Sequence, residues 1–352
     1  MAIDVPVLSL HDLDVPARRK ELAEQLGRAA RNSGFFQIVN HGVPQGEQFP
    51  SVSCLLPLSF LPADLIDRAF AVTQQAFALP LEEKQQYTRN PQTNRGYDVL
   101  GGQALKGAIG VGHDEQEKNG DIADAETPDL KEGWMIGPDG VDQTFEYWGR
   151  FGHGTNVLPS STQVPQMKEV MADYYNAMLS LATSLMKIVA LSLDMPEDTF
   201  AELCRLPAAA LRLLHYPPEL EGTGAGAHTD FGLITILATS GAPGLELFLP
   251  TQQWVPIEPA TGAFVVNVGD ILSLYTGGEY RSSLHRVQNR SGVRRYSIPF
   301  FLDGNSDVLV SPVRGPGLGK FAPVTVEQHL KTKFDASYYD TTASEAMKAV
   351  IG

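Results

Sequence analysis

Two side chains that often bind metal ions stand two positions apart in the second half of the chain. His228 and Asp230 occur in the stretch GTGAGAHTDFGLITIL. Alternate residues of an extended chain point the same way, so this imidazole and this carboxylate can reach one ion. His285 follows on a run that is expected to form a strand after the Gly277-Gly278 turn. We predict that His228, Asp230 and His285 form a metal site.

The chemistry of these three ligands favours iron(II). Two imidazoles and one carboxylate leave three adjacent coordination positions open, which suits iron(II) when oxygen and a bidentate cosubstrate must bind together. A structural zinc site would be closed by four protein ligands. An isolated His-x-Asp pair arises readily by chance, however, and a lone histidine on a strand is more often a hydrogen-bonded core residue. The assignment therefore depends on a second signature.

That second signature is Arg295 with Ser297, which share one face of the next expected strand. A hairpin through residues 289–292 can return both side chains to the metal site. A guanidinium pairs with a carboxylate through two parallel hydrogen bonds, and a serine hydroxyl can donate another. Arg295 alone would more often form a surface salt bridge. Beside the three metal-ligand candidates, the pair predicts a site for the distal carboxylate of a dicarboxylate cosubstrate.

The elements that must position these side chains are mostly strands. The second half alternates apolar runs with Gly and Pro turns, which predicts a β-sandwich or barrel; the runs lie near residues 211–216, 233–238, 245–248, 263–268, 271–275, 283–288 and 295–301. The first half is expected to be more helical, with strands at 5–10 and 35–39 and helices at 16–32, 64–79 and 166–193. Residues 90–120 and 137–161 are expected to form loops that cover a pocket.

Composition places the chain among soluble globular proteins. Of its 352 residues, 43% are hydrophobic and 19% are charged, and this length suits one compact unit. The formal net charge of −14 argues against nucleic acid or an anionic membrane as a partner. The first residues contain no basic leader with an apolar stretch, and Cys54 and Cys204 make no disulfide framework. We therefore expect a cytoplasmic protein that is a monomer or a weak homo-oligomer and takes a small-molecule substrate.

One segment does not match its surroundings. Residues 45–62, QGEQFPSVSCLLPLSFLP, are apolar, low in charge and without helical or strand periodicity, and they interrupt a connection that usually needs only a few residues. A genuine insertion at a surface or interface is one interpretation. The other is a translated in-frame intron, because the residue types allow pyrimidine-rich codons and splice signals at both ends. The coding DNA would decide between them.

Seven ordered motifs give the chain a resemblance to a known family: GFFQIVNHGV at 34–43, NRGY at 94–97, LRLLHYPP at 211–218, HTD at 228–230, VNVGD at 266–270, SLHRV at 283–287 and RYS at 295–297. Over nearly its whole length the sequence resembles the isopenicillin N synthase-like group of 2-oxoglutarate- and iron(II)-dependent oxygenases, in its fungal type. The resemblance implies a mainly β, α+β fold with flanking helices around a double-stranded β-helix, or jelly roll. It places an N-terminal region at 1–205, the jelly-roll core at 206–310 and a C-terminal helical extension at 311–352.

The resemblance also implies site residues and a reaction. Iron would be bound by His228, Asp230 and His285, and 2-oxoglutarate by Arg295, Ser297 and Tyr216, whereas Leu214 stands where many plant members have an asparagine. With O2 as the second cosubstrate, 2-oxoglutarate would be converted to succinate and CO2. A small organic molecule, expected to belong to secondary metabolism, would be hydroxylated, desaturated, cyclised or epoxidised. The alternatives are a nucleobase hydroxylase of the thymine type, and a metal-binding jelly roll without catalytic activity.

The substrate pocket is the part of the site that the sequence defines least. Matching positions suggest that its walls include Asn94, Tyr97, Trp134, Arg212, Phe231 and Phe301. If Arg212 points inward like Tyr216, its buried charge would be costly without a partner. We expect that partner to be a carboxylate, a carbonyl-rich heterocycle or Glu132.

Overall fold

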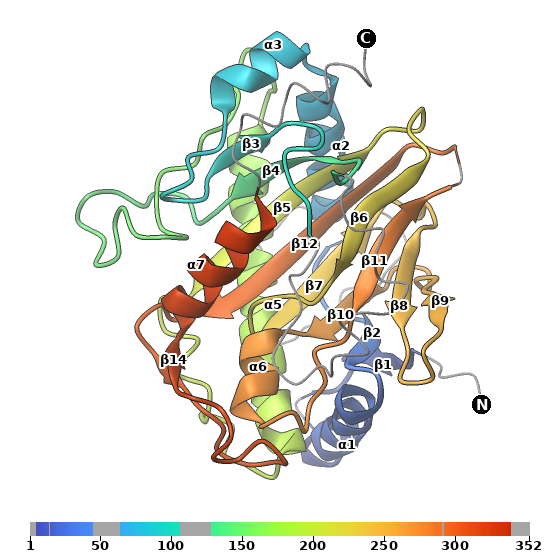
Figure 1. Ribbon diagram of the computed structural model, residues 1–352, viewed down its shortest axis with the longest axis vertical. Helices are drawn as coiled ribbons and strands as arrows, with labels where there is room; N and C mark the ends of the chain where they lie inside the picture. Colours follow the sequence, from blue (N-terminus) through green and yellow to red (C-terminus); the bar gives the residue numbers. More distant parts are fainter. Residues whose placement is uncertain (1–4, 14, 45–63, 106–127, 291, 339–352) are drawn as a thin grey trace.

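The computed structural model describes residues 5–13, 15–44, 64–105, 128–290 and 292–338. The segment 45–62, interpreted above as an insertion or a translated intron, lies outside the described residues, as does the second part of the expected loop at 90–120. Figure 1 shows the described elements arranged as two facing sheets with helices on the outside.

Within the described residues, eight strands form the larger sheet, which is antiparallel apart from one parallel pair at its edge. In spatial order they are β1 (Val7–Ser9), β2 (Phe35–Val39), β10 (Phe264–Val268), β7 (Ile234–Thr239), β12 (Arg295–Gly304), β5 (Ala208–Tyr216), β4 (Glu132–Ile136) and β3 (Gly96–Asp98). Strands far apart in the sequence thus become neighbours. The N-terminal strands extend a sheet whose centre comes from the second half of the chain.

The smaller sheet closes the other side of the jelly roll. Its strands, in spatial order, are β6 (Gly222–His228), β11 (His285–Asn289), β8 (Leu245–Phe248) and β9 (Trp254–Pro256). A further pair, β13 (Leu309–Val310) with β14 (Val324–Thr325), leads into the last helix. The sandwich-type architecture that the strand spacing predicts, and the jelly roll that the resemblance implies, are both confirmed.

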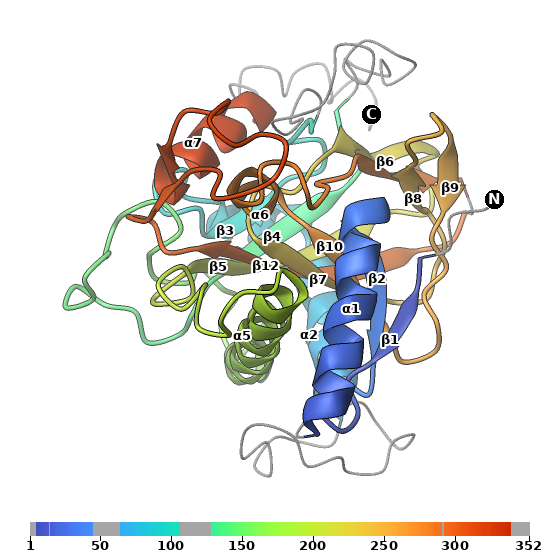
Figure 2. The ribbon, with the colours of Figure 1, turned by 90° about the horizontal axis from the view of Figure 1, so that it is seen from below.

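Three long helices cover the outer face of the larger sheet: α1 (Pro16–Asn32), α2 (Leu65–Ala78) and α5 (Met167–Ser192). Figure 2 shows them on one side of the sheet, and α5 packs against both α1 and α2. Their bounds match the predicted helices to within one residue. Gly34 ends the first helical segment with a φ of +69°, and a Cβ there would lie 2.0 Å from the backbone oxygen of Arg281. Only glycine allows this close, left-handed connection into β2.

The remaining helices are short or lie at the C-terminal side: α3 (Leu81–Lys84), the 3-10 turn η2 (Gln85–Tyr87), α6 (Asp270–Tyr275) and α7 (Val326–Ser337). A capping box of Thr325 and Gln328 starts α7, because each side chain bonds to the other residue's backbone N–H. In Figure 1, α7 lies beside β12, and the two elements are in contact.

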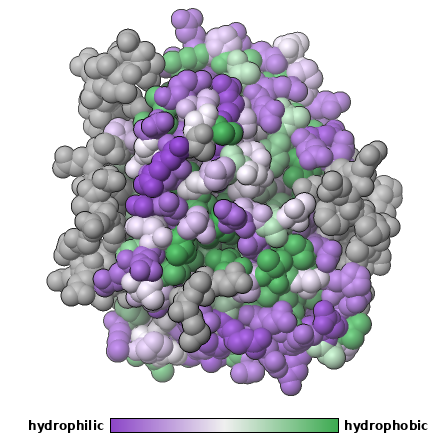
Figure 3. Space-filling view, turned by 90° about the vertical axis from the view of Figure 1, so that its right-hand side faces the viewer, coloured by the Kyte–Doolittle hydropathy of each residue, from purple (hydrophilic) through white to green (hydrophobic). Residues whose placement is uncertain are grey.

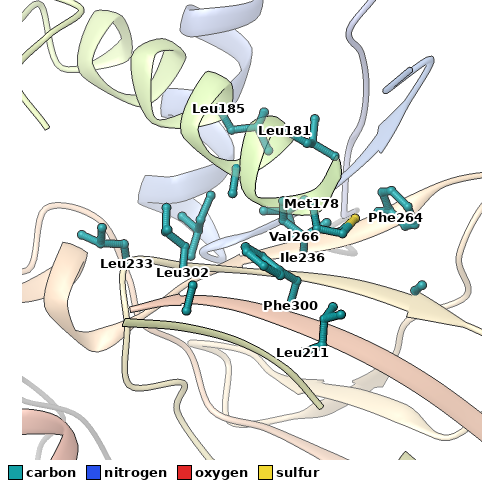
Figure 4. Close-up of a cluster of buried hydrophobic side chains, with 14 of the residues drawn as sticks. Met178, Leu181, Leu185, Leu211, Leu233, Ile236, Phe264, Val266, Phe300 and Leu302 are labelled. Carbon is teal, nitrogen blue, oxygen red and sulfur yellow. The ribbon is translucent and has the colours of Figure 1, made fainter. Parts of the chain in front are cut away.

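Alternation along β12 separates the core from the cavity. Ile298, Phe300 and Leu302 are fully buried toward the helices, and Figure 4 shows Phe300 and Leu302 in the cluster formed with Met178 and other α5 side chains. The intervening residues point to the opposite face of the sheet. Burying an aromatic or aliphatic side chain of this size contributes roughly 1.5–3 kcal/mol. The hydrophobic core thereby holds β12 in a register that determines which side chains enter the cavity.

Several elements differ from what their local sequence predicts. The run 271–275 was expected to be a strand but belongs to α6, because a short apolar segment buried on all sides carries no clear periodicity. The glycine-rich β6 contains a single β-branched residue, Thr223, and so gives little strand signal. β4 is short and begins with a charged residue and a glycine. β3 forms inside the expected loop at 90–120.

Among the described residues, no helix has the length and apolar character needed to cross a membrane. On the face shown in Figure 3, hydrophobic side chains gather near the centre and hydrophilic ones surround them. The exposed large hydrophobic side chains of the described residues come from separate parts of the chain, such as Val7, Leu81 and Leu206, and single residues of this kind are usual on a folded surface.

Candidate active site

The pairing of β6 with β11 brings the three predicted metal ligands together. His228 ends β6, His285 begins β11, and the two residues are direct partners in the antiparallel register. Their ring centroids are 4.3 Å apart, and each Nε2 lies 3.6 Å from Oδ1 of Asp230. One potential ligand atom from each residue lies within 4.8 Å of the others. Three donors this close on one side of a cavity can hold a single ion and leave its other side open.

Hydrogen bonds to the outer atoms orient these ligands. Nδ1 of His228 lies 2.7 Å from the Gly226 carbonyl oxygen, and Nδ1 of His285 lies 3.1 Å from that of Ser283. Because a carbonyl only accepts, each Nδ1 must carry the proton, which leaves the Nε2 lone pair for a metal ion. Asn267 donates to Oδ2 of Asp230 over 2.7 Å. Oδ1 is thereby the carboxylate oxygen that faces the imidazoles.

The electrostatic surroundings keep these groups in their metal-binding protonation states. Burial, helped by the charge of His285, lowers the pKa of His228 to about 3, so its imidazole is neutral near pH 7. Burial alone would raise the pKa of Asp230, but the two imidazoles and hydrogen bonds from Thr235 and Asn267 lower it. A neutral imidazole and an ionised carboxylate are the forms that bind cations.

Arg295 and Ser297 occupy the same cavity from β12. Arg295 is paired with Tyr216 of β5 in the sheet register, and its guanidinium lies 4.7 Å from the centre of the tyrosine ring. It is only 3% exposed and donates to the Ser297 hydroxyl over 3.1 Å, and no residue in the described part of the chain accepts a hydrogen bond from its Nε. Burial lowers the pKa of Arg295. No acidic side chain among the described residues forms an ion pair with it, and such a buried cation is suited to an incoming carboxylate.

The cavity between the two sheets measures about 950 Å³ including its mouth. It contains the three metal-ligand candidates, Arg295, Ser297 and Tyr216, so the iron-site and cosubstrate residues named from the sequence share one space. Of the six predicted substrate-pocket residues, four line it: Asn94, Arg212, Phe231 and Phe301.

Tyr97 and Trp134 do not line the cavity, and their assignment to the substrate pocket was wrong. They face each other across β3 and β4 and are 1% and 0% exposed on the helix side of the sheet. Nε1 of Trp134 donates to the Val157 carbonyl over 2.7 Å, and the Tyr97 hydroxyl donates to Glu132. Strand alternation places their neighbour Met135 in the cavity instead.

Arg212 lines the cavity as expected, but its acidic partner is not Glu132. Its guanidinium contacts Asp98 over 3.2 Å and donates to Gln103 over 2.7 Å. Glu132 lies on the other face of β4, where it accepts a hydrogen bond from Lys84 and forms a 2.7 Å contact with His215. The charge of Arg212 is therefore balanced inside the protein.

Further residues line the cavity besides those that the sequence predicts. Asp303 shares the strand face of Arg295, Ser297 and Phe301, so alternation along β12 could have identified it. Lys131 and Gln103 also line the cavity. Lys131 directly precedes β4 and Gln103 follows β3, and the sequence does not show which face of these short strands points into the cavity. Phe334 reaches the cavity from α7, and its place depends on how that helix packs.

Comparison with known proteins adds independent evidence. The family model described as the N-terminal region of the non-haem dioxygenase in morphine synthesis matches residues 5–161. The model described as the 2OG-Fe(II) oxygenase superfamily matches residues 207–304, which include all three metal-ligand candidates and Arg295. The two matches together span most of the chain.

Individual relatives are similar over almost their full length. The 2-oxoglutarate-Fe(II) type oxidoreductase hxnY of Emericella nidulans is 33% identical, covering 92% of this chain and 86% of its own. Clavatol oxidase claD of Penicillium crustosum is 35% identical over 92% of both chains. The crystal structure of a full-length Neurospora crassa protein in complex with alpha-KG and thymine has a TM-score of 0.74 at 22% identity, covering 94% of this chain and 96% of the other. That structure shares the fold.

Proposed function

The chain belongs to the 2-oxoglutarate- and iron(II)-dependent oxygenases, and from this premise we propose that it oxidises a small organic molecule of secondary metabolism in the cavity between its two sheets. Iron(II), 2-oxoglutarate and O2 are the cofactor and cosubstrates of this class. Fungal relatives named as 2-oxoglutarate-dependent dioxygenases or as a clavatol oxidase support the assignment to secondary metabolism. The outcome is hydroxylation, or desaturation, cyclisation or epoxidation.

One observation carries the proposal. An open set of two imidazoles and one carboxylate shares a cavity with a buried arginine that has no acidic partner among the described residues. A hydrolase with the same three ligands would have no need for that arginine. We assign His228, Asp230 and His285 to the metal ion, and Arg295, Ser297 and Tyr216 to the distal carboxylate of 2-oxoglutarate.

When bound, iron(II) and 2-oxoglutarate supply oxidation of an unactivated carbon by O2, with release of succinate and CO2. The protein's own groups orient the cosubstrate and the metal ligands, and they exclude water from the site. Arg295 and Ser297 bind the cosubstrate at one end, and Asn267 holds Asp230 so that one carboxylate oxygen faces the metal site. Apolar walls such as Leu214, Leu237 and Phe301 keep water from the reacting carbon. No acid–base side chain is required.

The direct test is anaerobic titration of the protein with iron(II) and 2-oxoglutarate. Chelation should produce a metal-to-ligand charge-transfer band in the visible region, and absence of that band would reject the proposed cosubstrate. Asp230→Ala should lose both the band and succinate formation coupled to substrate oxidation. Retained coupled turnover in this variant would contradict the assigned ligands. Succinate release across a substrate panel that includes thymine then narrows the substrate class.

We further propose that the protein acts in the cytoplasm as a monomer or weak homo-oligomer. The low cysteine content and the enclosure of the site residues within one chain support this. Size-exclusion chromatography with light scattering tests the oligomeric state, and a stable dimer at micromolar concentration would overturn it.

A further inference from the structure

Asp303 is an acidic group of the cavity that neither the metal site nor the cosubstrate site uses. Among the described residues that line the cavity, the acids are Asp230 and Asp303. Asp303 lies on β12, on the face that also carries Ser297 and Phe301. It is half-buried and borders the space that a substrate would occupy.

No hydrogen bond or ion pair from the described part of the chain reaches the Asp303 carboxylate. The positive charge of Arg95 lowers the pKa of Asp303, but the Arg95 side chain donates its hydrogen bonds to the carbonyl oxygens of Asn94 and Gly152. Oδ1 packs over Gly232, where an added Cβ would lie 2.3 Å away. Burial, with the charge of the nearby metal-site carboxylate, raises the pKa of Asp303 to about 7. The carboxylate therefore has a defined position at the border of the cavity, where it can accept a hydrogen bond from a bound molecule.

The cations of the same cavity are already engaged. Arg212 is paired with Asp98 at 3.2 Å, and Lys131 is paired with Asp129, its neighbour by two positions. Arg295 is reserved for the cosubstrate in the function proposed above. A substrate carboxylate would thus find no free cation among these three and would meet Asp303 as a like charge.

The rest of the substrate space is apolar and aromatic. Phe231, Phe301 and Phe334 contribute ring surfaces from three different elements, and Leu105 and Met135 add aliphatic walls. Phe231 and Phe334 meet edge to face, with ring centroids 5.4 Å apart. A ring or short apolar body can fill this space, and its polar group would be selected by the acid at the border.

We propose that Asp303 is a substrate-recognition residue, and that the substrate is a largely apolar molecule presenting an N–H or O–H donor, neutral or cationic, in place of a carboxylate. This rests on the oxygenase function proposed above and names the substrate class of the same cavity. No covalent step is involved: the donor hydrogen bonds to the Asp303 carboxylate while the apolar body contacts the aromatic walls.

The test compares three probes of nearly equal size: 2-phenylethylamine, 2-phenylethanol and phenylacetate. Each is titrated by calorimetry, under argon and above neutral pH, into the full-length protein loaded with iron(II) and 2-oxoglutarate. We expect the amine to bind most tightly and the alcohol next, with phenylacetate at least about tenfold weaker than the amine, because a charge-assisted hydrogen bond is replaced by repulsion. Asp303→Asn should weaken binding of the amine at least about tenfold and reduce the difference in affinity between the amine and phenylacetate. The matched control Asp335→Asn, at an exposed position of α7, should retain the wild-type ranking.

Equal or tighter binding of phenylacetate, or no binding of the amine at millimolar concentration, overturns the proposal. The ranking on the unaltered protein decides this even if Asp303→Asn fails to fold. An amine that binds tightly to wild type and equally tightly to a folded Asp303→Asn protein would also overturn it. Failure of the oxygenase function is seen separately, as absence of the charge-transfer band, since calorimetric ranking of the probes needs no turnover.

Discussion

Replacing Arg295 by methionine should change cosubstrate affinity and protein stability in opposite directions. The guanidinium is 3% exposed and has no acidic partner among the described residues. Two charge-assisted hydrogen bonds to a carboxylate contribute about 1.5–3 kcal/mol each, so their loss should weaken 2-oxoglutarate binding roughly 10²- to 10⁴-fold. Methionine removes a buried charge and retains much of the volume. The cosubstrate-free variant should therefore be no less stable than wild type, and up to about 4 kcal/mol more stable.

Thermal unfolding with and without 2-oxoglutarate, combined with calorimetry, measures both effects. 2-Oxoglutarate at a hundred times its dissociation constant should raise the free energy of unfolding of the wild-type protein by about 2.7 kcal/mol. The same concentration should leave the free energy of unfolding of Arg295→Met nearly unchanged. Arg294→Met is the matched control, because its half-exposed side chain only approaches Glu219 at 3.8 Å and should leave both quantities at wild-type values. Unaltered 2-oxoglutarate affinity in Arg295→Met would refute the assigned carboxylate site, and marked destabilisation would show that the protein itself satisfies the charge.

Three further predictions concern the metal ligands, the pH dependence and the core. Asn267→Ala removes the 2.7 Å hydrogen bond to Asp230 and should weaken iron(II) binding about 10- to 100-fold in a competition titration with a chelating dye; unchanged affinity would contradict the orienting role. Burial lowers the pKa of His41 from 6.5 to about 4, so the unfolded state binds the extra proton between these values and stability falls as pH decreases through them. Replacing His41 by Gln should flatten that slope by up to about 1.4 kcal/mol per pH unit in urea unfolding, and an unaltered slope would reject His41 as its source. Phe300→Ala should destabilise the protein by about 3–5 kcal/mol, whereas Phe301→Ala should mainly impair substrate turnover, and a reversed pattern would reject the assigned strand faces.

Local sequence patterns were sufficient for the features that depend on neighbouring residues. The spacing of His228 and Asp230, and of Arg295 and Ser297, placed each pair on one side of an extended chain. Side-chain direction in a strand alternates with a period of two, so these shared faces follow without knowledge of the fold. The long helices were equally predictable, because their apolar residues recur at helical spacing over many turns.

Elements with weak or ambiguous local signals were not predictable. The segment 271–275 contains a short apolar run that suits a buried strand as well as a buried helix, and it became α6. β6 is rich in glycine and carries little intrinsic preference for a strand, yet its pairing with β11 places His228 opposite His285. Such pairing forms because both strands complete the sheet that closes the cavity.

The content of the substrate pocket was decided by tertiary structure. The sequence predicts that Tyr97 and Trp134 line the pocket, but in the paired strands β3 and β4 both side chains point toward the helices. Phe334 reaches the cavity from α7, a helix far along the chain. Asp98 forms the ion pair that balances the charge of Arg212. The sequence by itself identified the groups that bind the metal ion and the cosubstrate, because each group contains a pair of residues two positions apart, whereas strand pairing adds His285 and Tyr216 to them. The walls around a substrate depend on contacts between distant segments, and only packing of the whole chain selects those.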